Sequence, residues 1–137
     1  MEIKSAKDLM SYKKAYDLAM QIFRISKAFP KAERFSLTDQ IRRSSRSVCL
    51  NLREVWAKRR YKAHFISKLT DCDAENDETS TSLDFALDCE YISKELHKET
   101  IDKYTEIQKM LKSMLFSPDK FLLHYSSIEE PEGMYES

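Results

Sequence analysis

The sequence predicts an all-α protein, an up-and-down antiparallel four-helix bundle followed by a flexible C-terminal tail. The first observation is the scarcity of chain breakers: the 137 residues contain one glycine, Gly133, and three prolines. Sheet-rich folds usually show many glycines, because their tight turns need positive φ angles. The second observation is that apolar residues recur every three or four positions in four segments, which is the spacing of one helix face. Long helices joined by short connections satisfy both observations.

The first predicted helix covers residues 6–28. Its apolar face is expected to carry residues at helical spacing, with Ile22 as an additional candidate: Leu9, Tyr12, Tyr16, Ala19, Met20 and Phe23. Phe29-Pro30 should end this helix, because a residue that precedes proline is pushed out of the helical region.

The second predicted helix begins near Ser36, a candidate N-cap, with Asp39 in the first turn. Its apolar seam is expected to consist of Leu37, Ile41, Val48, Leu52, Val55 and Trp56. At about 100° per residue, three arginines lie roughly 100–140° around the axis from Ile41: Arg42, Arg46 and Arg53. The opposite flank is small and polar, with Gln40, Ser44, Ser47 and Asn51.

The third predicted helix covers residues 61–89, and the fourth starts after Ser93 and continues to residue 116. The third should face inward with Phe65, Leu69, Cys72, Leu83, Ala86 and Leu87, and the fourth with Leu96, Ile101, Tyr104, Ile107, Leu111, Met114 and Leu115. The middle of the third holds poor helix formers between Asn76 and Ser82, some of which must lie close to the core. We therefore expect that helix to be loose, bent or hydrated there.

The predicted organisation is a bundle over residues 1–116 and a mostly disordered acidic tail over residues 117–137, interrupted by an apolar patch at 121–123. No signal peptide and no apolar run of membrane-spanning length occurs, so we expect a soluble cytoplasmic protein without membrane association. The cysteines, Cys49, Cys72 and Cys89, form no C-x-x-C pair and are interpreted as reduced, small apolar residues.

Formal net charge is zero, but the charges are segregated along the chain. Between Arg42 and Lys68 nine basic residues face one acid, Glu54, whereas the stretch from Asp71 to Glu90 holds eight acids and no lysine or arginine. The basic candidates for a nucleic-acid site or an interface are Arg42, Arg43, Arg46, Arg53, Lys58, Arg59, Arg60 and Lys62. They could contact phosphates, pair with the acids within or between subunits, or simply face solvent. The compensating acids favour pairing.

Catalytic motifs are weak. Arg59-x-x-x-x-His64 has the spacing of helical ribonucleases of the HEPN type, but it straddles a predicted helix junction. Bundle di-iron sites need a glutamate three residues before a histidine. His64, His97 and His124 have other residues at that position, and the single glycine excludes a glycine-rich phosphate loop. We therefore predict no enzymatic activity, no metal or other cofactor and no small-molecule substrate.

One run of residues resembles a known family: Phe29-Pro30-x-x-Glu33-x-Phe35-x-Leu37-x-x-Gln40-Ile41-Arg42-Arg43-Ser44-Ser45-x-Ser47, followed by Asn51-x-x-Glu54. With Tyr12-Lys13-x-Ala15 and Tyr91-Ile92-Ser93, it resembles the 23S rRNA-intervening sequence protein family over about residues 7–116. The resemblance implies an up-and-down bundle that forms homopentamers and has a proposed link to RNA. Val55 and Ala74-Glu75 depart from the family's small residues, and Glu78 matches its glutamate.

Three hypotheses follow. The first is a non-enzymatic oligomeric bundle, a homopentamer by the resemblance, that contacts RNA through the basic second helix. The second is a metal-independent ribonuclease that uses Arg59 and His64. The third is a scaffold without nucleic acid whose acidic third helix binds a basic protein. In all three we expect Gln40, Asn51, Glu54 and Glu78 to form a structural polar network.

Overall fold

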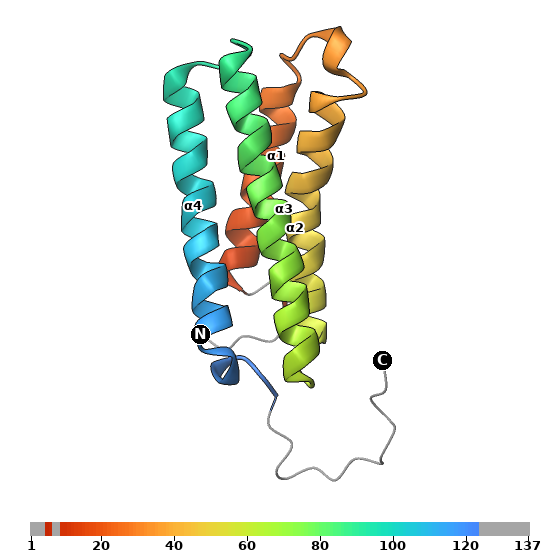
Figure 1. Cartoon of the computed structure of the whole chain (residues 1–137), viewed down its shortest axis with the longest axis vertical. Helices are drawn as coiled ribbons and strands as arrows, with labels where there is room; N and C mark the ends of the chain where they lie inside the picture. Colours follow the sequence, from red (N-terminus) through yellow and green to blue (C-terminus); the bar gives the residue numbers. More distant parts are fainter. Residues whose placement is uncertain (1–4, 7–8, 124–137) are drawn as a thin grey trace.

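The computed structural model describes residues 5–6 and 9–123, and this part of the chain folds as four helices (Figure 1). They are α1 (Met10–Ser26), α2 (Leu37–Ala57), α3 (Lys62–Asp88) and α4 (Lys94–Phe116). Two short 3-10 turns complete the described elements, η2 (Lys31–Glu33) and η3 (Pro118–Lys120). The all-α bundle that the sequence predicts is confirmed.

The four helices occupy the corners of a square. α2 lies against α1 and α3, α4 lies against α3 and α1, and the diagonal pairs make no close backbone contact. Successive helices run in opposite directions (Figure 1). α2 and α3 form the most extensive helix pair.

The face that α1 turns to the core differs from the predicted one. Its buried residues are mostly small: Ser11, Ala15, Leu18, Ala19, Ile22 and Ser26. Tyr16 and Met20, which were expected inside, are 52% and 40% exposed, and Tyr12 and Phe23 are half-buried. Small residues let α1 approach its neighbours closely, and the bulky side chains are displaced to the flank. The helix also begins at Met10 rather than near Ala6, because Leu9 is extended with a ψ of 132°.

The predicted core seam of α2 is buried from Leu37 to Val55, and only Trp56 remains half-exposed. Ser36 does occupy the N-cap position, but its hydroxyl caps nothing. It donates instead to the Glu33 carboxylate at 2.6 Å. The sequence therefore located the start of α2 correctly and assigned the wrong partner to Ser36.

The interior of α3 is polar at its middle. The helix is continuous from Lys62 to Asp88, although Asn76, Thr79 and Ser82 are buried. The Thr79 hydroxyl donates to Ser44 Oγ at 2.8 Å, and the Asn76 amide donates to the Tyr104 carbonyl at 3.1 Å. The predicted polar middle is confirmed, but these bonds connect it to α2 and α4 without a break in the helix. Within the described residues the Asn76 Oδ1 and Tyr104 hydroxyl oxygens have no partner.

The α3–α4 connection is short and tightly hydrogen-bonded. Glu90 has a φ of 64°, and the Tyr91 and Glu90 amides donate back to the Ala86 and Leu87 carbonyls at 2.8 and 2.9 Å. This is the Schellman arrangement, in which glycine is the usual residue at the position of Glu90. Ser93 then caps α4, because its hydroxyl accepts from the Leu96 amide.

The packed region continues past the boundary predicted at residue 116. The Phe121 ring stacks on Phe65 with centroids 6.4 Å apart, and Leu122 also contacts the core. Residues 124–137, where most of the predicted tail falls, lie outside the described part of the chain.

The three thiols occupy different environments. Cys49 and Cys72 are buried in the α2–α3 contact, and the Cys72 thiol donates to the Val48 carbonyl. All three cysteines are free, and Cys89 differs from the other two because it is exposed at the end of α3.

Candidate functional site

The outward face of α2 is basic. Arg43, Arg46 and Arg53 are exposed along it, and Leu50 lies among them with 63% of its surface exposed. Arg43 makes an exposed contact with Asp39 one turn away, at 3.6 Å. Within residues 9–123, Arg46 and Arg53 take part in no ion pair. These arginines are therefore available to a partner molecule.

Arg42 is directed toward α1. Its Nε donates to Ser26 Oγ at 2.7 Å, and its guanidinium lies 4.9 Å from the centre of the Phe23 ring. Lys27 and Arg46 approach the same ring at 4.7 and 5.9 Å. Arg42 thus joins α2 to α1, and the three cations surround one aromatic ring.

A groove of about 530 Å³ follows the outer side of the α1–α2 contact. Tyr12, Lys13, Tyr16 and Asp17 line it from α1, and Arg53 lines it from α2. The two tyrosine rings are tilted by 33° with centroids 6.2 Å apart. Sequence reasoning missed this groove because it assigned both tyrosines to the core; the polar Lys13 and Asp17 beside them were the available signal.

A second groove, of about 300 Å³, lies between α2 and α3. It is lined by Gln40, Arg43, Ser44, Ser47, Glu75 and Glu78. Burial raises the pKa of Glu75, and Glu78 raises it further through its charge and a hydrogen bond, whereas Arg43 opposes these effects. Two carboxyl groups are therefore held together beside one arginine.

The predicted polar network is divided between two places. Gln40 and Glu78 share the α2–α3 groove. Glu54 instead forms an ion pair with Lys68 at 2.6 Å, and this contact raises the pKa of Lys68. The Lys68 ammonium also lies 3.6 Å from Asp71. Asn51 is half-buried on the same flank of α2 as Ser47. Glu54 thus belongs to an ion pair with a lysine of α3 and does not share the groove of Gln40 and Glu78.

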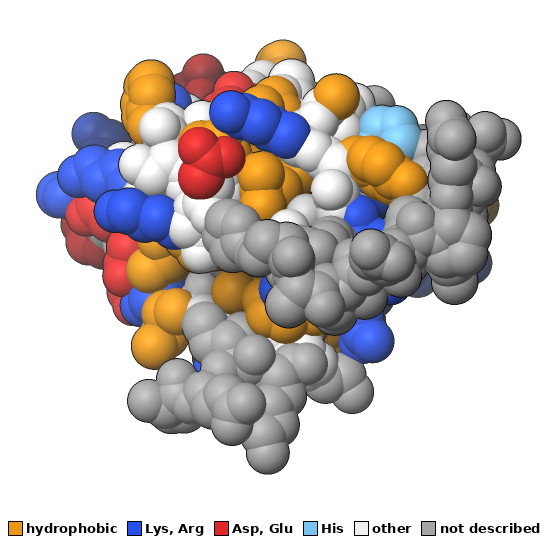
Figure 2. Space-filling view, turned by 90° about the horizontal axis from the view of Figure 1, so that it is seen from below, with side chains coloured by type: hydrophobic (Ala, Val, Ile, Leu, Met, Phe, Trp, Pro, Cys, Tyr) orange, Lys and Arg blue, Asp and Glu red, His pale blue; other side chains and the backbone are white. Residues whose placement is uncertain are grey.

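The remaining predicted cations lie at the end of the bundle where α2 ends and α3 begins. Figure 2 shows lysine and arginine side chains around this end, with hydrophobic surface between them. Arg59 donates through Nε to the Trp56 carbonyl at 2.7 Å, with its guanidinium 3.4 Å from the ring centre. Lys62 lies 3.7 Å from Asp119. His64 is half-buried near the start of α3, 5.4 Å from the Tyr61 ring, and Lys58 and Arg60 complete the cluster.

The outward face of α3 is acidic. Asp71, Asp77, Glu78 and Asp88 are exposed along it, together with the small residue Ala74. Phe85 lies near the end of the same face and is 59% exposed. Asp84 is turned toward α4, where it contacts His97 at 2.8 Å. Oppositely charged faces thus belong to neighbouring helices.

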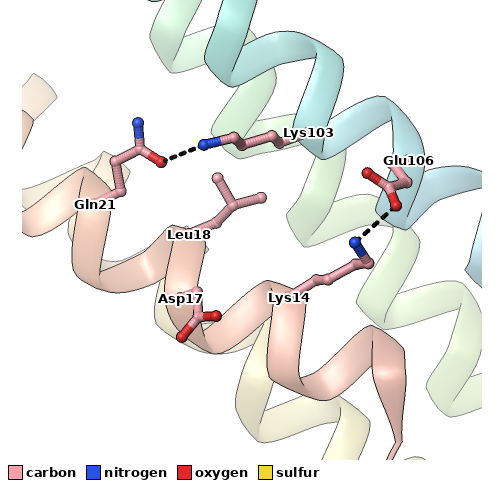
Figure 3. Close-up of a pocket in the computed structure, with 6 residues that line it drawn as sticks. All are labelled: Lys14, Asp17, Leu18, Gln21, Lys103 and Glu106. Carbon is pink, nitrogen blue, oxygen red and sulfur yellow. Dashed lines mark hydrogen bonds and ion pairs between the residues drawn. The ribbon is translucent and has the colours of Figure 1, made fainter.

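The contact between α1 and α4 carries a smaller groove, of about 230 Å³ (Figure 3). Lys14 pairs with Glu106 at 2.8 Å, and Lys103 donates to Gln21 at 3.4 Å, with Leu18 between these two bridges. The facing charges of this groove are largely paired with each other, so it is a weaker candidate than the faces of α2 and α3.

Two features are absent from the part of the chain that the structure describes. No group of three or more histidine, cysteine, aspartate or glutamate side chains there is arranged to hold a metal ion. None of the described helices has both the length and the apolarity needed to cross a bilayer.

The fold and these faces define a small four-helix-bundle protein with opposite charges on adjacent helices. The chain belongs to the 23S rRNA-intervening sequence protein family, whose profile matches residues 7–113. It is similar to the crystal structure of a protein of unknown function from the S23 ribosomal protein family of Bacteroides thetaiotaomicron. That similarity has a TM-score of 0.71 and 30% sequence identity, and covers 77% of this chain and 98% of the other. No curated protein matches the chain.

The residues that depart from the family pattern lie in different environments. Val55 is 1% exposed and belongs to the core, so it cannot obstruct a contact between subunits directly. Ala74 is exposed and still small, and Glu75 is half-buried in the α2–α3 groove. Glu75 is therefore the departure that bears on an external contact.

Proposed function

We propose that this protein is a non-enzymatic, homo-oligomeric helical bundle, with the pentamer that its family resemblance implies. The observation that carries the proposal is the separation of exposed charge onto two neighbouring helices, with Arg46 and Arg53 on α2 and Asp71, Asp77 and Glu78 on α3. Complementary charged surfaces favour association and select its orientation. In a monomer the two outward faces would not contact each other, so their opposite charges would provide no comparable attraction.

The non-enzymatic part of the proposal is supported by the position of Arg59. Its guanidinium covers the Trp56 ring and its Nε bonds to a main-chain carbonyl, so the side chain contributes to packing. An arginine that stabilises a developing charge must instead point its donors at the reacting group.

The decisive experiment is the molar mass in solution, measured by light scattering at low and high salt. A mass about five times the 16.2 kDa of the chain is expected at low salt, with dissociation as salt screens the charges. A monomer at every concentration and ionic strength would refute the oligomer. A monomer that bound basic proteins through α3 would favour the alternative of a protein-binding scaffold.

The α1–α2 groove favours a second candidate function, contact with single-stranded RNA. Tyr16 offers an exposed ring, while Lys13 and Arg53 provide cations beside it. Aromatic rings and cations together are the usual elements of single-strand binding, in which bases stack and phosphates are neutralised. The groove also contains Asp17, so this binding would depend on stacking as well as charge.

This candidate is tested by fluorescence anisotropy with a labelled single-stranded RNA over a series of salt concentrations. Tyr16→Ala should weaken binding at every salt concentration, whereas Arg53→Glu should also reduce the slope of affinity against salt. Arg34→Glu, an exposed change outside the groove, is the matched control. RNA affinity that does not respond to Tyr16→Ala or Arg53→Glu would place the binding elsewhere.

A further inference from the structure

The outward faces of α2 and α3 are complementary in shape and opposite in charge. We propose that copies of the chain associate head to tail, with Arg46 and Leu50 on α2 of one copy packed antiparallel against Ala74 and Glu78 on α3 of the next. The inference rests on the proposed oligomer and specifies its contact. Three features support this contact: the exposure of Leu50, the small size of Ala74 and the charges that flank both residues.

Three contacts within the chain establish which residues of α2 and α3 lie at the same height along the bundle. Ser44 lies beside Thr79, Val48 beside Cys72, and Glu54 beside Lys68. Arg46 is therefore level with residues 75–77, and Leu50 with residues 70–72. When copies surround an axis parallel to their helices, heights are retained between neighbours. Arg46 then faces the turn that carries Glu78, and Leu50 faces the turn between Thr70 and Ala74.

The side chains at this height are sterically matched. Leu50 is 63% exposed, which leaves a large apolar side chain without cover in the single chain. Ala74 is exposed on the outward face of α3, between Thr70 and Glu78 in the same stripe. Packed helices lie about 8–10 Å apart, depending on the side chains between them. A leucine opposite an alanine fits this spacing, and the contact would remove the exposed apolar surface of the leucine from water, which favours association.

The charges at this height also favour the contact. Glu75 and Glu78 lie together in the α2–α3 groove, which Arg43 of the same chain also lines. Arg46 has no ion pair among the described residues. A guanidinium from the next copy would place its fork of donors on these carboxylates, a geometry that carboxylates accept in a bidentate manner. Like-charge repulsion within the groove would be relieved at the same time.

The relative positions of the two faces lead to a closed assembly. α2 and α3 occupy adjacent corners of the bundle, so their outward directions differ by about 90°. A head-to-tail contact repeats, and it closes into a ring when the rotation between copies is compatible. Seen from one copy, the directions to its two neighbours differ by about 90° in a ring of four and by about 110° in a ring of five. The faces of this chain therefore suit a small ring rather than an open filament.

The inference is tested by charge exchange on the full chain, with mass measured by light scattering and folding checked by circular dichroism. Arg46→Glu and Glu78→Arg should each shift the oligomer to monomer at concentrations where the wild type is assembled. The double variant, Arg46→Glu with Glu78→Arg, should reassemble, because every head-to-tail contact then regains an opposite pair. Leu50→Asp should also yield monomer, whereas Met10→Asp, at an apolar position that is 58% exposed on α1, should not.

The outcomes separate this inference from the proposed function. A wild type that is monomeric throughout overturns both. An oligomeric wild type whose mass is unchanged by Arg46→Glu, Glu78→Arg and Leu50→Asp leaves the oligomer standing and overturns the contact proposed here. Dissociation by the single charge changes without recovery in the folded double variant would show that Arg46 and Glu78 do not face each other.

Discussion

The Tyr91 hydroxyl donates a 2.8 Å hydrogen bond to the Glu33 carboxylate, which connects the α3–α4 turn to the α1–α2 connection. Ser36 donates to the other carboxylate oxygen, and the Tyr91 ring packs on Phe29 at 5.6 Å. These residues are separated widely in the sequence, so the contact closes one end of the bundle.

Tyr91→Phe is expected to lower the midpoint of thermal unfolding at neutral pH, because it removes one donor from Glu33. Hydrogen bonds from Ser36 and Tyr91 lower the pKa of Glu33 below its ordinary 4.5. A lowered pKa means that the contribution is present above 4.5 and is lost as pH falls through the folded value. The difference between wild type and variant should therefore shrink in acid. A difference that stays constant from pH 7 to pH 3 would exclude this origin.

Glu90→Gly is expected to stabilise the protein by roughly 1 kcal/mol, since a residue with a side chain is strained at positive φ. Glu90 has a φ of 64° at the end of α3. The free energy of unfolding is measured by urea denaturation, under conditions where the assembly state is unchanged. Glu90→Ala is the control and should give no such gain, because alanine has the same restriction.

Tyr104→Phe is expected either to leave the free energy of unfolding unchanged or to raise it by up to about 1 kcal/mol. The hydroxyl is buried without a partner in the described residues, and burial raises its pKa. Thr79→Val should act in the opposite direction by a similar amount, because it breaks the buried bond to Ser44. Equal losses for both variants would indicate that the Tyr104 hydroxyl is satisfied in solution.

A chain ended after residue 116 is expected to be less stable than one ended after residue 123. The shorter chain lacks Phe121 and so uncovers Phe65, which is 1% exposed in the structure. An aromatic pair contributes about 0.5–1.5 kcal/mol beyond the area it buries. Thermal unfolding of the two chains measures the difference, and Phe121→Ala in the longer chain should reproduce most of it.

Arg59→Ala should lower the free energy of unfolding by about 0.5–1 kcal/mol through loss of the contact with Trp56.

The purified protein is expected not to cleave RNA. The assay uses a labelled RNA in the presence of a chelator. Cleavage that disappears in His64→Ala while the fold is retained would support the ribonuclease hypothesis instead. Cleavage that survives this change would point to a contaminant.

The number, order and direction of the helices could be predicted from the sequence, because large apolar residues recur at helical spacing on the buried faces of α2 and α4. Prediction was less successful for α1. Its core face is made of Ser11, Ala15 and Ser26 alongside Leu18 and Ile22, and a hydrophobic pattern gives little weight to small residues. The strained turn at Glu90 also escaped prediction, because glutamate gives no sign of positive φ.

The candidate site was predicted in composition but not in arrangement. The sequence showed a basic helix followed by an acidic one. In the structure, several of these cations differ from one another because each contacts a different neighbouring side chain. Arg42 lies on Phe23, Arg59 lies on Trp56, and Lys62 lies near Asp119. The contact of Arg59 with Trp56 is local, but the contacts of Arg42 and Lys62 join segments far apart in the sequence and cannot be read from one helix alone. The α1–α2 groove was missed because Tyr12 and Tyr16, which line it, were assigned to the core.

The distribution of thiols provides a built-in reporter of assembly. Burial raises the pKa of Cys49 to about 11, and Cys72 is shifted in the same direction, so neither offers a reactive thiolate at neutral pH. Cys89 alone is exposed, and a maleimide dye should attach once per chain. In a ring whose copies point the same way, all dyes would lie at one rim. Energy transfer between identical dyes would then follow subunit exchange in real time, without a mutation at either face.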